Sequence, residues 1–442
     1  MIYAYIFKEY SIAALLVNRR PALGMNASPQ TSFDVVIIGG GAGGMSVAAR
    51  LQRSGERLRI AVIDPAEYHY YQPAWTLVGG GQYDVRKTRR RMRDCLPHGI
   101  VFVPGRVASF SPDQNAVTLA DGTTFAYKCL VVAAGIEINW DAIEGLVDTL
   151  GRNGVTSNYR YDLAPYTWEC IRSFTGGRAL FTQPPMPIKC AGAPQKILYL
   201  AADHFRRKRV NAQIRFFTPG PSMFGVPFFS KALTEVMRDY AAEACFGQQL
   251  VKVDGPARIA YFELAVDGSK TIHAERFDML HVVPPQGAPR FIRESPLADA
   301  AGWVEVDKET LRHVRYGNVF GIGDCISTPN SKTAAAVKNQ APVVAENVMA
   351  TLACRPLSSA YDGYASCPLT TSAGKVMLAE FCYDGTVTPS FPADPRRPRR
   401  LYWWLKQAFL PYLYWNVVIR GKHWPATHKR RLFPEELPPI KP

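Results

Sequence analysis

A glycine-rich turn between a strand and a helix constrains the fold more than any other feature of this sequence. The apolar run FDVVII at 33–38 is typical of a buried parallel strand, and GGGAGG follows it directly. Gly39, Gly41 and Gly44 form the pattern G-x-G-x-x-G there. The first glycine permits a tight turn, the second lets a pyrophosphate approach the backbone, and the third lets helix and strand pack closely.

An acidic residue follows where this motif requires one. We expect a helix from about 45 to 53 and a second strand from 59 to 63, which ends at Asp64. A carboxylate at that strand end can bind a ribose hydroxyl, while the helix N-terminus stabilises phosphate charge. These residues predict a βαβ dinucleotide-binding unit, and a glycine-rich turn without a ligand is the weaker interpretation.

The second half of the chain indicates which dinucleotide is bound. GNVFGIGDC at 317–325 places Gly323 and Asp324 at a strand end, ahead of a helix expected from 333 to 349. An acid there can hydrogen-bond the ribityl chain of a flavin. The helix that starts near Lys332 can direct its positive end at the flavin ring. FAD is therefore predicted, with a simple helix cap at Asp324 as the alternative.

A second unit repeats this order but lacks a nicotinamide site. Strands are expected at 178–183 and 213–217, with a helix from 195 to 207 between them. Where G-x-G-x-x-G would be needed the chain reads PPMPIKCAGAP, and the second strand ends in FFTPG without an acid for a ribose. We infer that NAD(P)H is not a substrate and that the electrons come from another donor.

Two cysteines in unusual settings suggest how electrons enter. Cys190 lies in the proline-rich turn beside Lys189, and both the approaching helix start and the lysine favour a thiolate. A buried apolar cysteine is the ordinary alternative. Cys367 precedes Pro368 in DGYASCPLTT, which we expect to be a polar loop rather than core. Two distant thiols and a flavin together suggest a disulfide-based electron-transfer site.

Composition narrows the possible ligands and partners. The nine cysteines include no C-x-x-C pair and the histidines show no metal-ligand spacing, so we predict no metal. The net charge of +15 fits either nucleic acid or an anionic membrane. Because two basic runs flank an aromatic C-terminal segment, we favour a membrane surface and predict no nucleic-acid partner. The basic runs lie at 86–93, 206–209, 396–400 and 428–431.

The 442 residues are enough for several domains. We expect a first dinucleotide fold built from two distant parts of the chain, a second fold inserted between them, and a C-terminal region of different composition. The N-terminal extension is expected to be non-structural, or an over-long start that precedes Met25. The predicted ranges are 1–30 for the extension, 31–150 and 300–355 for FAD binding, 151–299 for the second fold and 356–442 for the C-terminal region.

Seven longer segments carry a specific resemblance that covers about 33 to 433. They are DPAEYHYYQPAWTLVGGG (64–81), PIKCAGAPQK (187–196), AGWVEVDKETLRH (301–313), GNVFGIGDC (317–325), SKTAAAV (331–337), YDGYASCPLTT (361–371) and LPYLYWNVVIRG (410–421). Together they resemble sulfide:quinone oxidoreductase, of the mitochondrial type and its bacterial relatives, within the FAD-dependent pyridine nucleotide-disulfide oxidoreductases. The resemblance implies an α/β protein with two Rossmann-like, glutathione-reductase-like folds and a C-terminal membrane-docking segment.

The resemblance also implies the chemistry. Hydrogen sulfide would attack a disulfide or trisulfide bridge between Cys190 and Cys367, leaving a persulfide on Cys367 and a thiolate on Cys190. Two electrons would pass through FAD to ubiquinone, and a small acceptor such as glutathione, another thiol or sulfite would remove the sulfur. Many bacterial relatives use a third cysteine. None of the remaining seven cysteines has a clear claim to that role here, and Cys325, which follows Asp324, is the one to test.

The cofactor contacts follow from the motifs and the resemblance together. Ala42 and Gly43 complete the phosphate turn, and Gln72 and Val107 match family positions. The predicted FAD contacts are Gly39, Gly41, Ala42, Gly43, Gly44, Asp64, Gln72, Val107, Gly323, Asp324 and Lys332.

The aromatic segment LYWWLKQAFLPYLYWNVVI at 401–419 is the expected membrane contact. A bilayer span needs roughly 20 mostly apolar residues, and Lys406, Gln407, Pro411 and Asn416 interrupt this run. We therefore expect one or two interfacial helices, broken at Pro411, with Trp and Tyr at the headgroup level. Core helices or a dimer interface are the alternatives.

The family resemblance implies a peripheral, monotopic protein of the bacterial cytoplasmic or the mitochondrial inner membrane. Its oligomeric state stays open, with a homodimer as one option. The expected walls of a quinone pocket are Phe224, Phe228, Phe229, Phe381 and Tyr383.

Other functions fit the sequence less well. A type II NADH:quinone oxidoreductase or a coenzyme A disulfide reductase needs the nicotinamide site that the second fold lacks. A flavocytochrome-type sulfide dehydrogenase, which passes electrons to haem, does not account for the aromatic segment. A basic flavoprotein that binds nucleic acid would need its basic runs on one continuous face.

Overall fold

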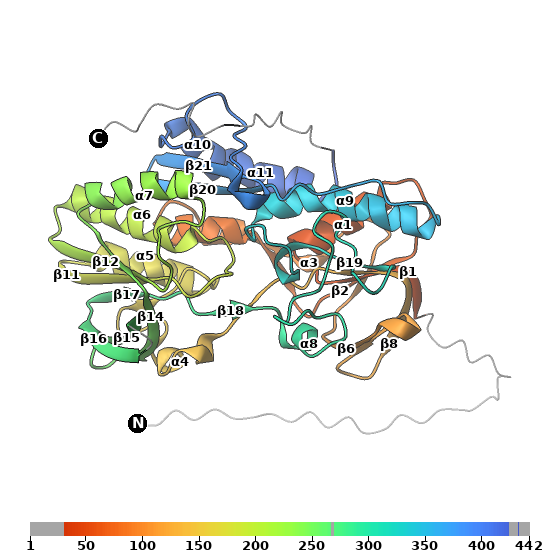
Figure 1. Ribbon diagram of the computed structural model, residues 1–442, viewed down its shortest axis with the longest axis horizontal. Helices are drawn as coiled ribbons and strands as arrows, with labels where there is room; N and C mark the ends of the chain where they lie inside the picture. Colours follow the sequence, from red (N-terminus) through yellow and green to blue (C-terminus); the bar gives the residue numbers. More distant parts are fainter. Residues whose placement is uncertain (1–30, 267–268, 424–431, 433–442) are drawn as a thin grey trace, which may run out of the picture. The chain divides into compact units, whose positions relative to one another are not determined.

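The computed structural model describes residues 31–266, 269–423 and 432. The extension expected at 1–30 and the basic run at 428–431 lie outside the described residues. Within the described part, the chain is mixed α/β and contains two larger sheets, one mostly and one fully parallel, in line with the two Rossmann-like folds expected from the sequence (Figure 1).

The first sheet joins segments from two distant parts of the chain. Its strand order is β5-β2-β1-β8-β7-β6, and β19 also pairs with β8. Strands β5, β2, β1, β8 and β19 are parallel, whereas β6, β7 and β8 pair with one another as an antiparallel meander. The strands are β1 (Ser32–Ile38), β2 (Ile60–Ile63), β5 (Val101–Val103), β6 (Val107–Ser111), β7 (Ala116–Leu119), β8 (Thr124–Val132) and β19 (Val319–Gly321).

Two helices that begin at the predicted cofactor motifs pack against each other beside this sheet. These are α1 (Ala42–Gln52) and α9 (Ala334–Leu352). Thr333 caps α9, because its Oγ1 accepts a hydrogen bond from the Ala336 amide at 3.2 Å. The central strand β1 is almost entirely buried, as expected for a parallel sheet covered on both faces.

The second sheet is fully parallel, in the order β10-β17-β11-β12-β13. Its strands are β10 (Val155–Thr156), β11 (Gly177–Thr182), β12 (Ala212–Thr218), β13 (Glu243–Phe246) and β17 (Met279–His281). Helices α5 (Leu163–Ser173), α6 (Ala193–Lys208) and α7 (Pro227–Asp239) contact it. Pro194 in the first turn and three basic residues in the last turn suit α6.

Smaller elements complete the two folds. An antiparallel sheet packs below the second fold with strands β14 (Gln248–Asp254), β15 (Ile259–Val266) and β16 (Ser269–Arg276). Two short ladders pair segments distant in sequence: β3 (Tyr68–Tyr70) with β4 (Arg89–Arg91), and β9 (Glu137–Ile138) with β18 (Gln286–Gly287). The short helices are α2 (Trp75–Gly79), α3 (Met92–Cys95), α4 (Leu146–Thr149) and α8 (Arg290–Arg293).

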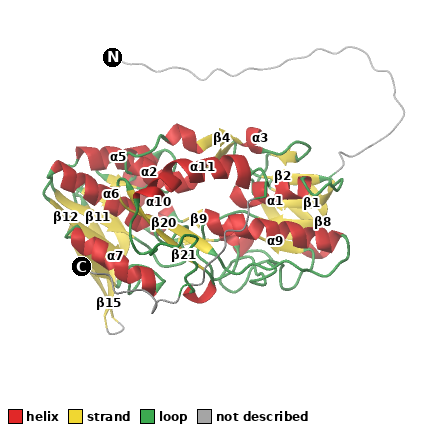
Figure 2. Cartoon of the chain, turned by 90° about the horizontal axis from the view of Figure 1, so that it is seen from above, coloured by secondary structure: helices red, strands yellow, loops and turns green. Residues whose placement is uncertain are grey.

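The C-terminal region bridges the two folds. The hairpin of β20 (Ala365–Ser372) and β21 (Lys375–Phe381) contacts α6 of the second fold and α9 of the first. In Figure 1 this region, in blue, lies above both folds, and Figure 2 looks onto the same face. The arrangement is compatible with the domain ranges predicted from sequence, whose boundaries stay a prediction.

The last helical segment runs without interruption from Arg400 to Val418. It consists of α10 (Arg400–Trp404), a π-type turn, α11 (Leu410–Leu413) and a second π-type turn. The break expected at Pro411 is therefore wrong. Proline lacks the amide that a regular turn would use, and the wider π-type turns on either side keep the segment helical.

Candidate functional site

The fold brings the two predicted cysteines together across 177 residues of sequence, with their Sγ atoms 3.4 Å apart. Cys190 lies between β11 and α6, in a left-handed backbone conformation with φ of 56°. Cys367 is fully buried in β20, opposite Ala379 of β21, so the expectation of a polar loop is wrong. Both residues have free thiols, at a separation well beyond the roughly 2.05 Å of a disulfide bond.

Gly192 allows the turn that carries Cys190 to pack closely against the strand that carries Cys367. A Cβ atom at this position would lie 2.8 Å from the Cys367 Sγ and 2.3 Å from Cδ2 of Leu369. Both distances are shorter than packed atoms tolerate, so the turn after Cys190 can lie against β20 only because residue 192 has no side chain.

Lys196 is the cation that contacts the Cys190 sulfur. Its Nζ donates a hydrogen bond to Cys190 Sγ at 3.1 Å, from the first turn of α6. The expectation that Lys189 supplies this charge directly is wrong, because the Lys189 ammonium donates to Oε1 of Gln72. Side chains on a helix point back toward its N-terminus, which directs Lys196 at the turn that holds Cys190.

The two thiols differ in acidity. The hydrogen bond from Cys367 and then the charge of Lys196 lower the pKa of Cys190 well below its ordinary value, against the opposing effect of burial. Donating that hydrogen bond, together with burial, raises the pKa of Cys367 well above the ordinary value. Burial opposes a charge on Lys196, yet the two sulfurs raise its pKa overall. The site therefore favours a thiolate on Cys190, a thiol on Cys367 and an ammonium on Lys196.

A second lysine reaches the site from the C-terminal helix. Lys406 is buried, and its Nζ donates to the Pro368 carbonyl at 2.9 Å and to Oγ1 of Thr370. Burial, followed by repulsion from Lys196, lowers the pKa of Lys406 well below its ordinary value. The residue that sequence reasoning treated only as an interruption of an apolar run thus touches the strand that carries Cys367.

Around Lys189, the backbone links the cysteine turn to the predicted cofactor motifs. The Cys190 amide donates to the Lys332 carbonyl at 2.9 Å, and the Lys189 amide donates to Oε1 of Gln286 at 2.8 Å. The Tyr159 hydroxyl donates to the Lys189 carbonyl at 3.1 Å. Cys190 is therefore fixed between the start of α9 on one side and β20 on the other.

The phosphate turn has the geometry that the glycine motif predicts. Gly39 adopts a φ of +101°, and a Cβ on Gly44 would lie 1.8 Å from the Gly39 carbonyl oxygen. Asp64 accepts hydrogen bonds from the amides of Gly40 at 2.6 Å and Ala66 at 2.7 Å, while burial raises its pKa. No side chain lies within 4 Å of a Cβ built on Gly41, which leaves that backbone open to a pyrophosphate.

The C-terminal helix also contacts this turn. The Tyr414 hydroxyl donates to Nε2 of His69 at 2.6 Å, and Nδ1 of His69 donates to the Gly40 carbonyl at 2.8 Å. Burial lowers the pKa of His69 to about 4, so the ring stays neutral, as these two hydrogen bonds require. The C-terminal helix, which the sequence favours as a membrane contact, thus also helps to hold the phosphate turn in place.

The flavin half of the predicted site also fits a cofactor. Asp324 is half-buried, and burial raises its pKa against the attraction of Lys332 and Lys189. Buried polar atoms near Lys189 have no hydrogen-bond partner within the described residues, and they belong to Gln286, Asn330 and Ser331. A polar ligand in this place would satisfy them, as buried polar groups normally are. The residues therefore fit FAD.

Other predicted cofactor residues lie beside these motifs. Ala42 begins α1, and Gly43 packs against Ile322. Val107 is buried in β6. The Lys332 ammonium donates to the Ile326 carbonyl at 2.9 Å and lies over the Trp303 ring, so it is held by protein groups. Individual FAD contacts of these residues stay a prediction.

Four of the five residues expected at a quinone pocket form one aromatic cluster. The ring of Phe224 lies 5.8 Å from Phe381 and 6.4 Å from Phe229, which in turn lies 5.0 Å from Phe228. Tyr383 packs instead on Tyr361. Three of the four phenylalanines are buried, which accounts for the cluster as core packing, and their role toward quinone stays a prediction.

The remaining cysteines and histidines show no comparable arrangement. The Cys325 thiol is buried against the Val132 and Ile322 carbonyls, and burial raises its pKa to about 11, which makes it an unreactive core thiol. Across the described ranges, no three His, Cys, Asp or Glu side chains are grouped as metal ligands. Over the same ranges, no helix has the length and hydropathy to cross a bilayer.

Substituting Gly192 by alanine tests the close approach. We expect a loss of about 1–3 kcal/mol in unfolding free energy from overpacking and a slower bridging of the two thiols. Thermal denaturation and mass-spectrometric counting of free thiols measure these effects. Gly225→Ala is the matched control, since a Cβ there meets nothing within 4 Å. Equal behaviour of the two variants would contradict the steric argument.

Comparison with known proteins first defines the class. A family described as "Pyridine nucleotide-disulphide oxidoreductase" matches residues 33–165. The solved sulfide:quinone oxidoreductase from Aquifex aeolicus has the same fold, with a TM-score of 0.72 at 19% identity over 88% of this chain and 92% of that chain. The family match and the sequence relatives together define the class as an FAD-dependent oxidoreductase.

Sequence relatives then identify the family. The mitochondrial sulfide:quinone oxidoreductase of Dictyostelium discoideum is 43% identical over 88% of this chain and 86% of its own length. The Mus musculus protein of the same name is 39% identical, over 93% and 91%. The chain belongs to the sulfide:quinone oxidoreductase family.

Proposed function

We propose that this protein oxidises hydrogen sulfide at Cys190 and Cys367 and reduces ubiquinone through FAD. The observation that carries the proposal is the pair of thiols 3.4 Å apart, with Lys196 on the Cys190 sulfur and the predicted flavin motifs on its other side. This arrangement suits a bridge that opens and closes, because one sulfur is stabilised as a leaving thiolate and the other is not.

The first step opens the oxidised bridge. HS⁻ attacks the Cys367 sulfur, a new S–S bond forms there, and the bond toward Cys190 breaks. Cys190 leaves with the electron pair as a thiolate, next to the Lys196 ammonium. A trisulfide bridge reacts in the same way with one sulfur more, and two bonds of about 2.05 Å each can span a gap like the one observed.

The second step removes the sulfur and closes the bridge. An acceptor thiolate such as glutathione, or sulfite, bonds to the outer sulfur of the Cys367 persulfide, and the electron pair of the broken bond stays on Cys367. Re-forming the bond between Cys190 and Cys367 releases two electrons, and FAD held at the predicted motifs would supply the redox chemistry that passes them to ubiquinone. The two cysteines thus return to their starting state for each sulfide consumed.

Anaerobic rapid mixing of the FAD-loaded protein tests the function. We expect sulfide to bleach the flavin absorbance, a short-chain ubiquinone to restore it, and NADH to have no effect. The missing nicotinamide motif is the reason for the last expectation. Bleaching by NADH but not by sulfide would overturn the proposal in favour of an NADH:quinone oxidoreductase.

The C-terminal helix favours peripheral attachment to a membrane, because it exposes apolar side chains to solvent and buries a lysine. Leu401, Trp404, Ala408 and Tyr412 recur every three or four residues and are all exposed, whereas Lys406 is buried on the opposite side. We call these four residues the apolar stripe. Such a stripe suits insertion into the interface of a mitochondrial inner or bacterial cytoplasmic membrane, from which quinone would enter.

Replacing Leu401, Trp404 and Tyr412 together by serine tests the attachment. We expect at least about 100-fold weaker binding to lipid vesicles, because three large apolar side chains no longer insert. Reduction of long-chain ubiquinone should fall accordingly, while flavin reduction by sulfide is retained. Flotation measures binding, and Val147, Ile272 and Val314, which are equally exposed, serve as a triple serine control. Unchanged flotation of the stripe variant would contradict a docking role.

A further inference from the structure

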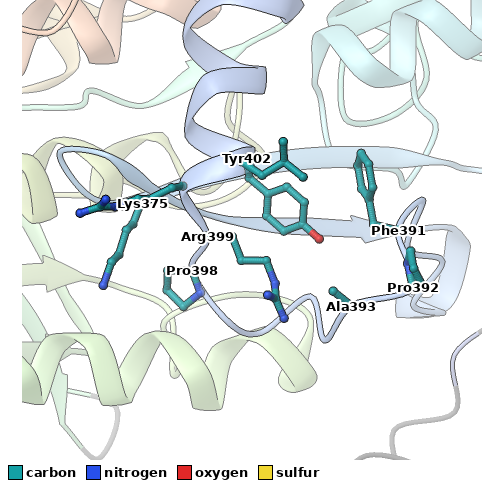
Figure 3. A pocket seen from close by; sticks show the side chains of 9 residues that line it. Lys375, Phe391, Pro392, Ala393, Pro398, Arg399 and Tyr402 are labelled. Atoms are coloured by element: carbon teal, nitrogen blue, oxygen red, sulfur yellow. The ribbon is translucent and has the colours of Figure 1, made fainter.

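A hollow of about 580 Å³ opens beside the first turn of the C-terminal helix. Its walls come from the start of β21, the loop that precedes α10, and α10 itself (Figure 3). The apolar part of the lining includes Phe391, Pro398, Leu401 and Tyr402, with the Phe391 and Tyr402 rings 5.3 Å apart. Leu401 also begins the apolar stripe, so the hollow and the stripe are continuous on the surface.

Three cations line the same hollow, and none has an acidic partner among the described residues. Lys375, Arg399 and Arg400 form no ion pair within the part of the chain that the structure describes, and Nε of Arg399 is buried without any hydrogen-bond partner there. The nearby carboxylates are already engaged. Asp394 pairs with Arg396, and Glu380 accepts hydrogen bonds from Tyr364 and Ser390.

The backbone holds these cations in place. Arg399 and Val376 exchange two hydrogen bonds, at 2.9 and 3.2 Å, which join the loop before α10 to β21. Lys375, the residue before Val376, therefore lies beside the end of this loop, where Arg399 is followed by Arg400 at the start of α10. A guanidinium whose Nε has no hydrogen-bond partner among the described residues, next to two further cations and above apolar walls, is a site for an anion that carries an apolar group.

We propose that this hollow binds the headgroup phosphate of an anionic phospholipid while the apolar stripe inserts beside it. The inference rests on the proposed membrane attachment and adds a lipid class to it. The three cations neutralise the phosphate, and the walls around Tyr402 and Phe391 cover the glycerol and the first methylenes of the lipid. A cation near an anionic leaflet is attracted by about 1 kcal/mol, so three of them discriminate strongly between anionic and neutral bilayers.

Vesicle flotation of the FAD-loaded protein tests the site. The probes are vesicles of phosphatidylcholine alone and vesicles with one fifth phosphatidylglycerol. The variant is Lys375→Gln/Arg399→Gln/Arg400→Gln, and the control is Arg172→Gln/Arg178→Gln/Arg276→Gln, which removes the same charge from exposed positions of the second fold. We expect roughly 10- to 100-fold weaker binding of the variant to the anionic vesicles only, with binding to neutral vesicles and sulfide-driven flavin bleaching unchanged.

Three results would overturn the headgroup site. Equal losses for the variant and the control would show that net charge alone is sensed. Equal losses on both vesicle types would show that the hollow contributes only apolar contact. A raised KM for ubiquinone without a change in flotation would assign the hollow to quinone. The single variant Arg400→Gln changes only an exposed side chain and should leave folding intact. It should reproduce part of the loss of binding to anionic vesicles. Failure of the wild-type protein to bind either vesicle would instead refute the membrane attachment itself.

Discussion

Replacing Cys190 by serine is expected to abolish reduction of the bound FAD by sulfide. Serine cannot form the bridge to Cys367. Its hydroxyl does not ionise readily either, so no oxygen anion can replace the thiolate as the leaving group. In the proposed mechanism the bridge is the electrophile that sulfide attacks, so the rate constant for flavin reduction should fall by at least about 10³-fold, as for other residues that act as one unit. The Cys367→Ser variant should lose flavin reduction by the same factor, and the double variant should be only slightly slower than either single variant.

Anaerobic stopped-flow spectroscopy of the flavin band measures this loss, and the absorbance of the purified protein reports how much FAD is retained. We expect full FAD content, since the phosphate turn and Asp324 are untouched. Cys354→Ser is the matched control, because Cys354 is the exposed thiol at the end of α9. A Cys190→Ser protein that turns over sulfide at the normal rate would remove the bridge from the mechanism.

Most of the fold could be predicted because its signals are local. The strand, the glycine turn and the helix at 33–52 lie next to each other in sequence, and each glycine answers one steric requirement of the βαβ unit. The same holds for α9, whose start at Thr333 agrees with the expected one. The lack of a nicotinamide-binding motif before α6 could also be predicted, because that motif would consist of residues next to one another in the sequence.

The electrostatics of the site could not be predicted, because they depend on residues that only the tertiary fold brings together. Lys189 is next to Cys190 in sequence but reaches Gln72, whereas Lys196, seven residues after Lys189 and in the first turn of α6, reaches the sulfur. Knowing that helical side chains lean toward the N-terminus could have singled out Lys196. Nothing local placed Lys406 beside the strand of Cys367, which requires the docking of the whole C-terminal helix.

Cys367 shows why polar neighbours misled the prediction. Its segment carries serine, threonine and proline, which are typical of a loop, yet β20 pairs with β21 and most of its residues are buried. The hairpin is buried because α6 and α9 both pack against it. The thiol therefore meets Cys190 on a rigid strand, which limits the motion needed to open and close the bridge.

Replacing Lys196 by methionine is expected to slow flavin reduction by sulfide about 10²-fold at neutral pH while leaving FAD bound. In the proposed mechanism the thiolate on Cys190 is the leaving group. Lys196 is the only cation among the described residues with a hydrogen bond to it, so removing Lys196 resembles the loss of one donor from an oxyanion site. Methionine keeps the volume of the lysine stem in the buried turn, so the protein should fold.

The pH dependence separates this electrostatic role from a structural one. In the wild-type protein the pKa of Cys190 is lowered by the hydrogen bond from Cys367 and by Lys196, so its thiolate persists at low pH. Without Lys196 the pKa of Cys190 rises, and the pH profiles of flavin reduction and of thiol alkylation shift to higher pH. The rates of the two proteins should therefore converge as pH increases. Lys208→Met, at an exposed position in the last turn of the same helix, should keep the wild-type profile. A Lys196→Met protein that is slower at every pH by the same factor would show that Lys196 only shapes the turn and does not stabilise the leaving thiolate.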